Sequence, residues 1–77
     1  MTPDQCRQAR ELLGWHQQRL ALQANSCLSS VAGFEAGEKV TRPATVNAFR
    51  TALEAAGVEF ITENGDGAEV RLRRAAP

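Results

Sequence analysis

Apolar residues recur at helical spacing over most of the chain, in stretches separated by turn residues. Thr2 and Gln5 form a Thr-x-x-Gln capping box before the first stretch, and Gly14 follows it. Asn25 stands after the second stretch and Gly37 after the third, where left-handed backbone is needed. Together these signals predict helices near residues 3–13, 17–24, 28–36 and 43–56.

The pattern changes to a period of two after Gly57. The segments "VEFIT" and "AEVRL" alternate and are separated by the turn-rich "ENGDG". Pairing Phe60 with Val70 places apolar side chains on one face and Glu59 opposite Arg71. This predicts a hairpin near residues 58–62 and 68–73, which must pack on other elements because isolated hairpins are marginal. The expected class is mainly α, with a helical region over residues 1–57, a hairpin region over 58–74 and a tail over 75–77.

Composition limits the protein's partners. The 77 residues make one small domain, and nine Lys and Arg balance nine Asp and Glu. A net charge of zero argues against a purely electrostatic nucleic-acid binder but leaves room for a local basic patch. No apolar run approaches the roughly 20 residues of a membrane span, and "MTPDQC" lacks a signal-peptide pattern. We therefore expect a cytoplasmic protein with no membrane contact and with reduced cysteines.

The reactive residue types do not form a catalytic or metal-binding pattern. One His and two Cys, without short ligand spacing, make a poor zinc set. Cys6 and Cys27 fit a small buried or capping role better than that of a reactive thiol. No nucleophile–base pair or phosphate loop is present. We expect no enzyme activity, no cofactor and no metal.

The segment Gln17 to Ala36 contains two short predicted helices joined by a tight turn. Ala21 is small where the two helices approach, and Leu20, Ala24, Val31 and Phe34 can close the wedge between them. This is the helix-turn-helix arrangement, whose second helix can enter the DNA major groove. A purely structural helical hairpin is the alternative.

The chain resembles the XRE-type regulators, the phage Cro and phage-repressor-like family. The resemblance rests on "LLGWHQQRLALQAN", "VAGFEAG" and "RPATVNAFRTALEAAGVEF", which occur in order and at family spacing from Pro3 to about Gly57. It implies a lambda-repressor-like helix-turn-helix fold and sequence-specific binding to DNA.

The resemblance also implies roles for individual residues. Leu28, Ser29 and Gly33 fall on positions that read base edges, and Arg10 and Glu35 match an ion pair that joins the first and third helices. We assign contacts to the DNA backbone to His16, Gln17, Ser30, Lys39 and Arg42.

The predicted recognition helix, residues 28–36, has few side chains that can hydrogen-bond to bases. Ser29 can hydrogen-bond a base or a phosphate, and Leu28 can meet a thymine methyl, but neither makes a bidentate base contact. Gly33 can only permit close approach of the backbone. Such a helix can dock by shape, methyl contacts and phosphate anchors, or it can serve a partner other than DNA.

We therefore expect a dimeric repressor that places residues 28–36 in the major groove of a palindromic double-stranded DNA operator. The hairpin is the candidate dimer surface, to which we assign Ile61, Val70 and Leu72. Arg71, Arg73 and Arg74 fit a solvated face as well as a DNA or partner contact. The alternative function is a protein-interaction module on the same fold, antitoxin-like or antirepressor, which the zero net charge and Leu28 favour.

Overall fold

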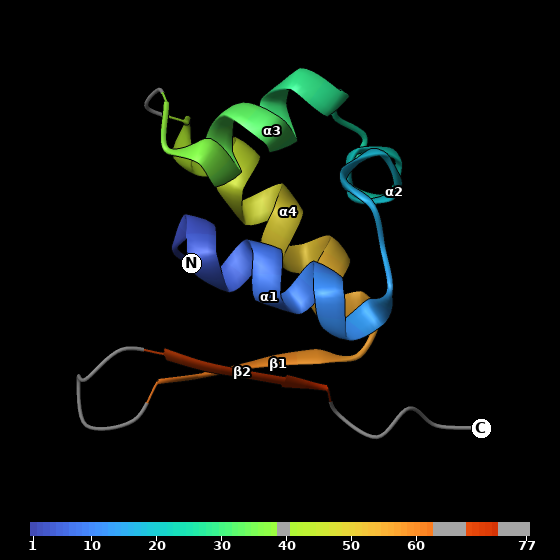
Figure 1. Cartoon of the computed structure of the whole chain (residues 1–77), viewed down its shortest axis with the longest axis vertical. Helices are drawn as coiled ribbons and strands as arrows, with labels where there is room; N and C mark the ends of the chain where they lie inside the picture. The colour runs from blue at the N-terminus through green and yellow to red at the C-terminus, as the bar shows by residue number, and fades with distance from the viewer. Residues whose placement is uncertain (39–40, 63–67, 73–77) are drawn as a thin grey trace.

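The computed structural model describes residues 1–38, 41–62 and 68–72. Within these residues, four helices precede a two-stranded antiparallel hairpin (Figure 1), which confirms the predicted class. Two helices end one residue before the predicted position, because Ala24 and Ala56 are their C-caps. The "ENGDG" segment, Arg73, Arg74 and the tail lie outside the described residues. The elements are α1 (Pro3–Leu13), α2 (Gln17–Gln23), α3 (Leu28–Ala36), α4 (Pro43–Ala55), β1 (Val58–Thr62) and β2 (Ala68–Leu72).

Local hydrogen bonds explain why α1 begins and ends where it does. The Thr2 hydroxyl accepts from the Gln5 backbone at 3.1 Å, and the Gln5 side chain accepts from the Thr2 backbone at 2.8 Å. The capping box is therefore complete. Gly14 ends α1 with a φ of 70°, and Gly37 ends α3 with a φ of 68°. Asn25, with a φ of 56°, is the left-handed residue expected after α2.

The core lies among the four helices and the inner face of the hairpin. Its largest fully buried side chains are Phe49, Leu20, Leu53 and Val31. The rings of Phe34 and Phe49 lie 5.8 Å apart, centroid to centroid, and join α3 to α4. The remaining buried apolar residues are Cys6, Ala9, Ala21 and Val58.

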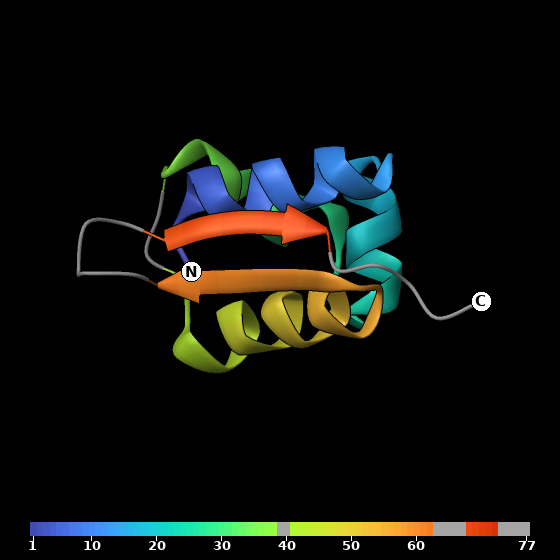
Figure 2. The ribbon, with the colours of Figure 1, turned by 90° about the horizontal axis from the view of Figure 1, so that it is seen from below.

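The hairpin has the predicted register. Phe60 pairs with Val70, and Glu59 pairs with Arg71, whose Nε donates to the Glu59 carboxylate at 3.2 Å. Seen from below in Figure 2, β2 runs alongside α1 and β1 runs alongside α4, so that these two helices cover one face of the hairpin. The cover is uneven, since Val58 is 1% exposed and its partner Leu72 is 47% exposed.

The arrangement places α3 and the hairpin on opposite sides of the molecule (Figure 1). The helices α1 and α4 lie between them, so a ligand held on α3 would not touch the hairpin of the same chain. None of the helices in the described ranges is both long and apolar enough to cross a membrane.

Candidate nucleic-acid interface

The turn between α2 and α3 is fixed by packing and by backbone hydrogen bonds. Residues 24–27 connect the two helices. Ala21 is 3% exposed on the side of α2 that packs on the core. The Ser26 amide donates to the Ala21 carbonyl at 2.8 Å, and Asn25 supplies the left-handed step. The chain thus reverses within four residues and presents α3 at a defined angle.

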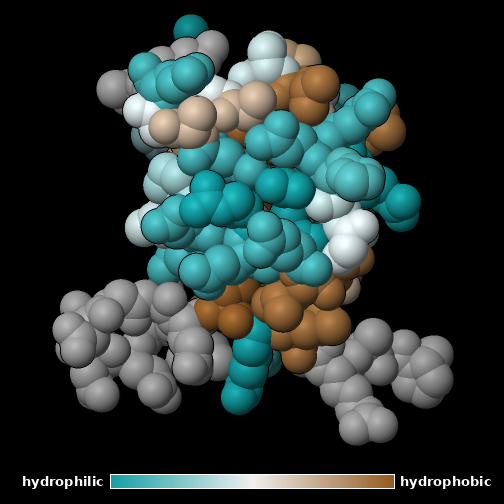
Figure 3. Space-filling model, viewed as in Figure 1, coloured by the Kyte–Doolittle hydropathy of each residue, from teal (hydrophilic) through white to brown (hydrophobic). Residues whose placement is uncertain are grey.

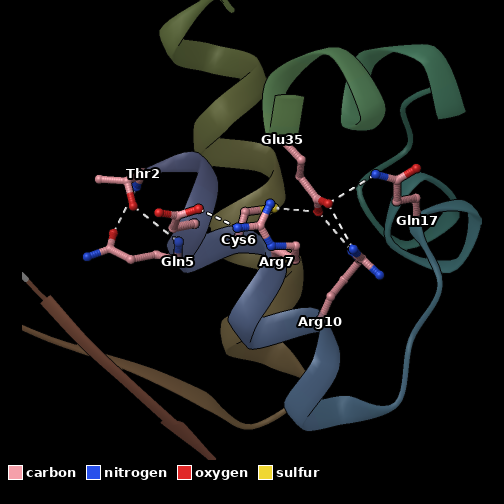
Figure 4. Close-up of polar contacts among 8 residues, drawn as sticks. Thr2, Gln5, Cys6, Arg7, Arg10, Gln17 and Glu35 are labelled. Carbon is pink, nitrogen blue, oxygen red and sulfur yellow. Dashed lines mark hydrogen bonds and ion pairs between the residues drawn. The ribbon is translucent and has the colours of Figure 1, made fainter. Parts of the chain in front are cut away.

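The C-terminal half of α3 is anchored to α1 by a buried ion pair (Figure 4). Arg10 donates through Nε to Glu35 Oε2 and through Nη2 to Glu35 Oε1, both at 2.8 Å. The Arg10 side chain is 12% exposed and that of Glu35 is 4% exposed. The ion pair expected from the family resemblance is therefore present, in bidentate form.

Two further side chains complete the environment of Glu35. Gln17, at the start of α2, donates through Nε2 to Glu35 Oε1 at 3.0 Å, and the buried Cys6 thiol donates to Oε2 at 3.3 Å. Arg10 also donates through Nη1 to the Trp15 carbonyl at 2.9 Å. One carboxylate therefore ties together α1, α2 and α3. We call Cys6, Arg10, Gln17 and Glu35 the Glu35 cluster.

The pKa values within the Glu35 cluster follow from this geometry. Burial alone would raise the pKa of Glu35, but the hydrogen bonds from Arg10, Gln17 and Cys6 outweigh it and hold the pKa below its ordinary value. The hydrogen bond to Glu35 raises the pKa of Arg10. Burial, together with the neighbouring negative charge, raises the pKa of the Cys6 thiol. Cys6 is thus a neutral donor and Glu35 an ionised acceptor at neutral pH.

The outer face of α3 carries small and apolar residues. Leu28 is 48% exposed, Ser29 and Ala36 are exposed, and Ala32 is half-buried. Gly33, which we expected among the base-reading residues, is buried. The assignment of Gly33 to the base-reading positions stays a prediction. Leu28 and Ser29 remain on the exposed face.

The N-terminus of α3 holds a thiol and two hydroxyls in contact. Cys27 caps the helix without a side-chain bond to its backbone. Its Sγ lies 3.3 Å from the Ser29 hydroxyl and 3.2 Å from the Ser30 hydroxyl. These hydroxyls, Ser29 first, lower the pKa of the exposed Cys27 thiol to about 7. The Ser29 and Ser30 hydroxyls therefore have a partner within the chain before any ligand arrives.

Few cations near α3 are free to meet a phosphate. Arg42, the N-cap of α4, is exposed and has no acidic partner among the described residues. Arg19 stacks over the Trp15 ring at 5.3 Å from its centroid. His16 is exposed and makes no side-chain cap bond, whereas Gln17 is half-buried and already donates to Glu35. Lys39 lies outside the described residues. The other described arginines form ion pairs, namely Arg7, Arg10, Arg50 and Arg71.

The residues assigned to dimerisation lie apart from α3. Val70 is half-buried against the core, and Leu72 is exposed at the end of β2. The side chain of Ile61 lies outside the description, although its backbone pairs with residue 69 in the hairpin. Leu12, near the end of α1, is 44% exposed. Figure 3 shows apolar surface below α1, where that helix meets the hairpin.

In the described part of the chain, no group of three or more His, Cys, Asp or Glu residues is placed to hold a metal ion.

Comparison with known proteins supplies no family for this chain. No family model matches the sequence, and no curated protein matches it.

Proposed function

We propose that this protein is a sequence-specific DNA-binding transcriptional regulator, a dimeric repressor that places α3 in the major groove of an operator. The proposal includes a lambda-repressor-like helix-turn-helix fold, with α2 and α3 as its two helices. Leu28 and Ser29 would face the bases, while His16, Gln17, Ser30, Lys39 and Arg42 would meet the backbone.

The observation that carries the proposal is the support given to α3. The outer face of this helix is exposed at Leu28 and Ser29, whereas its inner face is held by Val31, Phe34 and a fully hydrogen-bonded Glu35. An exposed helix on such a rigid base suits a binding element, because little side-chain or backbone freedom must be lost on docking. The four-residue turn after α2 matches the geometry in which the second helix enters a groove.

Dimerisation would come from the hairpin, on the side of the molecule away from α3. An operator contact by one module of this size is small, and two half-sites raise both affinity and specificity. Leu72 offers exposed apolar surface at the end of β2, and Val70 lies beside it on the same face.

Selection of bound duplexes from random-sequence DNA tests the proposal directly. We expect a palindromic site with half-sites about one helical turn apart. Affinity for that site should fall steeply with added salt, because phosphate contacts release counterions. Recovery of no preferred sequence, together with salt-insensitive or absent binding, would reject the proposal.

A protein-interaction module, antitoxin-like or antirepressor, is the second candidate. Leu22 on α2 is 70% exposed and Leu28 on α3 is 48% exposed, and the chain has no net charge. An apolar protein contact through these leucines would persist at high salt, which separates it from DNA binding in the same titration.

A further inference from the structure

The exposed face of α3 has one chemical character along its length. Leu28, Ala32 and Ala36 follow one another at spacings of four, so they lie on one side of the helix, with Ser29 next to Leu28. Within α3, the one ionisable side chain is that of Glu35, which is buried. Figure 3 shows apolar and weakly polar surface over α3, above the hydrophilic surface of α1.

This face has few hydrogen bonds to offer. The Ser29 hydroxyl, its one polar side chain, lies 3.3 Å from the Cys27 thiol and shares a hydrogen bond with it. No side chain on the face can form the paired hydrogen bonds by which Arg, Asn or Gln distinguish guanine or adenine. The strongest direct discrimination that this face can offer is therefore apolar contact with a base, beside the single hydroxyl of Ser29.

Among the groups that base pairs display in the major groove, the thymine C5-methyl is apolar, whereas the others are hydrogen-bond donors or acceptors. Leu28 projects from the first turn of α3 and remains about half exposed in the free protein. Ala32 and Ala36 add little bulk, so α3 can lie close to the base edges without a long side chain holding it away. A leucine in this position can cover a methyl group that water would otherwise surround.

We infer that Leu28 is the main specificity-determining residue of α3 and that it selects thymine through its 5-methyl group. The inference rests on the proposed function, since it names the chemical feature that the same α3 surface would read. The preferred half-site should contain a thymine whose methyl contributes to affinity.

The test replaces single thymines by deoxyuridine in the duplex recovered from random-sequence selection. This change removes the methyl group and leaves the Watson–Crick pairing intact. Loss of one buried methyl should weaken binding roughly fourfold, and roughly fifteenfold when both half-sites are changed. Leu28→Ala should abolish the difference between the thymine and deoxyuridine duplexes.

Leu22→Ala is the matched control, because Leu22 is an exposed leucine on α2 rather than α3. It should leave the thymine preference unchanged. If the protein binds a selected duplex with a steep salt dependence but no deoxyuridine substitution weakens it, the inference fails and the proposed function stands. If no duplex is selected, both fail. A thymine preference that survives Leu28→Ala would show that Leu28 is not the residue that selects thymine.

Discussion

At the residue scale, the central feature is a single buried carboxylate that accepts from three side chains. Glu35 is 4% exposed at its side chain and is surrounded by donors from α1 and α2. A buried ion pair adds little stability over an apolar pair, but removing one partner leaves an uncompensated charge. The Glu35 cluster is therefore a strict constraint on which residues can occupy these positions.

Arg10→Met tests that constraint. We expect the free energy of unfolding to fall by about 3 kcal/mol, since Glu35 loses its counter-charge while it remains buried. Urea denaturation at neutral pH measures the loss. Arg7→Met is the control one turn earlier on α1, where the ion pair with Asp4 is exposed and worth under ~1 kcal/mol. Equal losses for the two variants would contradict the central role of the pair.

The two thiols should react very differently. The Ser29 and Ser30 hydroxyls lower the pKa of the exposed Cys27 to about 7, so its reactive thiolate forms as pH rises through that value. Cys6 is buried and its pKa is raised, so it should stay protected until the chain unfolds. Iodoacetamide labelling between pH 6 and pH 9, read by peptide mass spectrometry, should show a midpoint near pH 7 for Cys27 alone. Early labelling of Cys6 would contradict the burial described above.

At the element scale, the sequence predicted most boundaries because their causes are local. Thr2 with Gln5, Gly14 and Asn25 each act within one turn of backbone, and each was found in the predicted conformation. The hairpin register also followed from the sequence, since a slip of one residue would have turned Phe60 and Val70 to the other face.

The links between elements were harder to predict. The ion pair between Arg10 and Glu35 was expected only from family resemblance. The donation by Gln17 and Cys6 to the same carboxylate was missed, because residues 18 and 29 positions apart meet only once the helices pack. The burial of Gly33 was not predicted either, since burial of a glycine depends on what lies against the helix rather than on its own polarity.

The exposed end of β2 yields a prediction about assembly. Leu72→Asp places a charge where apolar surface is exposed, so it should leave the monomer folded. If the hairpin forms the dimer surface, the variant should dimerise roughly tenfold or more weakly, because the lost apolar contact is replaced by a buried charge. Sedimentation equilibrium measures the dimer constant, and circular dichroism checks the fold.

Leu22→Asp is the control for this experiment, since Leu22 is exposed on α2 and Figure 1 shows α2 on the side of α1 away from the hairpin. It should dimerise as the unaltered protein does. A folded Leu72→Asp variant with an unchanged dimer constant would exclude this end of β2 from the interface and direct attention to a helix face.

At the scale of the whole molecule, the separation of α3 from the hairpin allows two contacts to form without competition. The helices α1 and α4 fill the space between these surfaces, and the Glu35 cluster holds α3 against α1 and α2. A net charge of zero gives no long-range attraction to DNA, so any electrostatic contribution to affinity must come from a few locally placed cations.

Arg42 is the described cation best placed to supply that affinity. It is exposed at the start of α4, beyond the C-terminal end of α3, and has no acidic partner among the described residues. Arg42→Ala should weaken binding to specific and non-specific duplexes by similar factors and reduce the slope of log K against log salt by about one. Fluorescence anisotropy between roughly 50 and 200 mM salt measures both quantities. Lys39→Ala should act likewise, although Lys39 lies outside the described residues.

Arg7→Ala removes the same charge from α1, where Arg7 already pairs with Asp4, and so controls for net charge. Its salt slope should match that of the unaltered protein, because a paired cation away from α3 releases no counterion from DNA. Ser29→Ala should instead change the preferred sequence more than the non-specific affinity. An Arg42→Ala variant with an unaltered salt slope would show that Arg42 does not contact phosphate. It would exclude the start of α4 from the proposed DNA-binding surface.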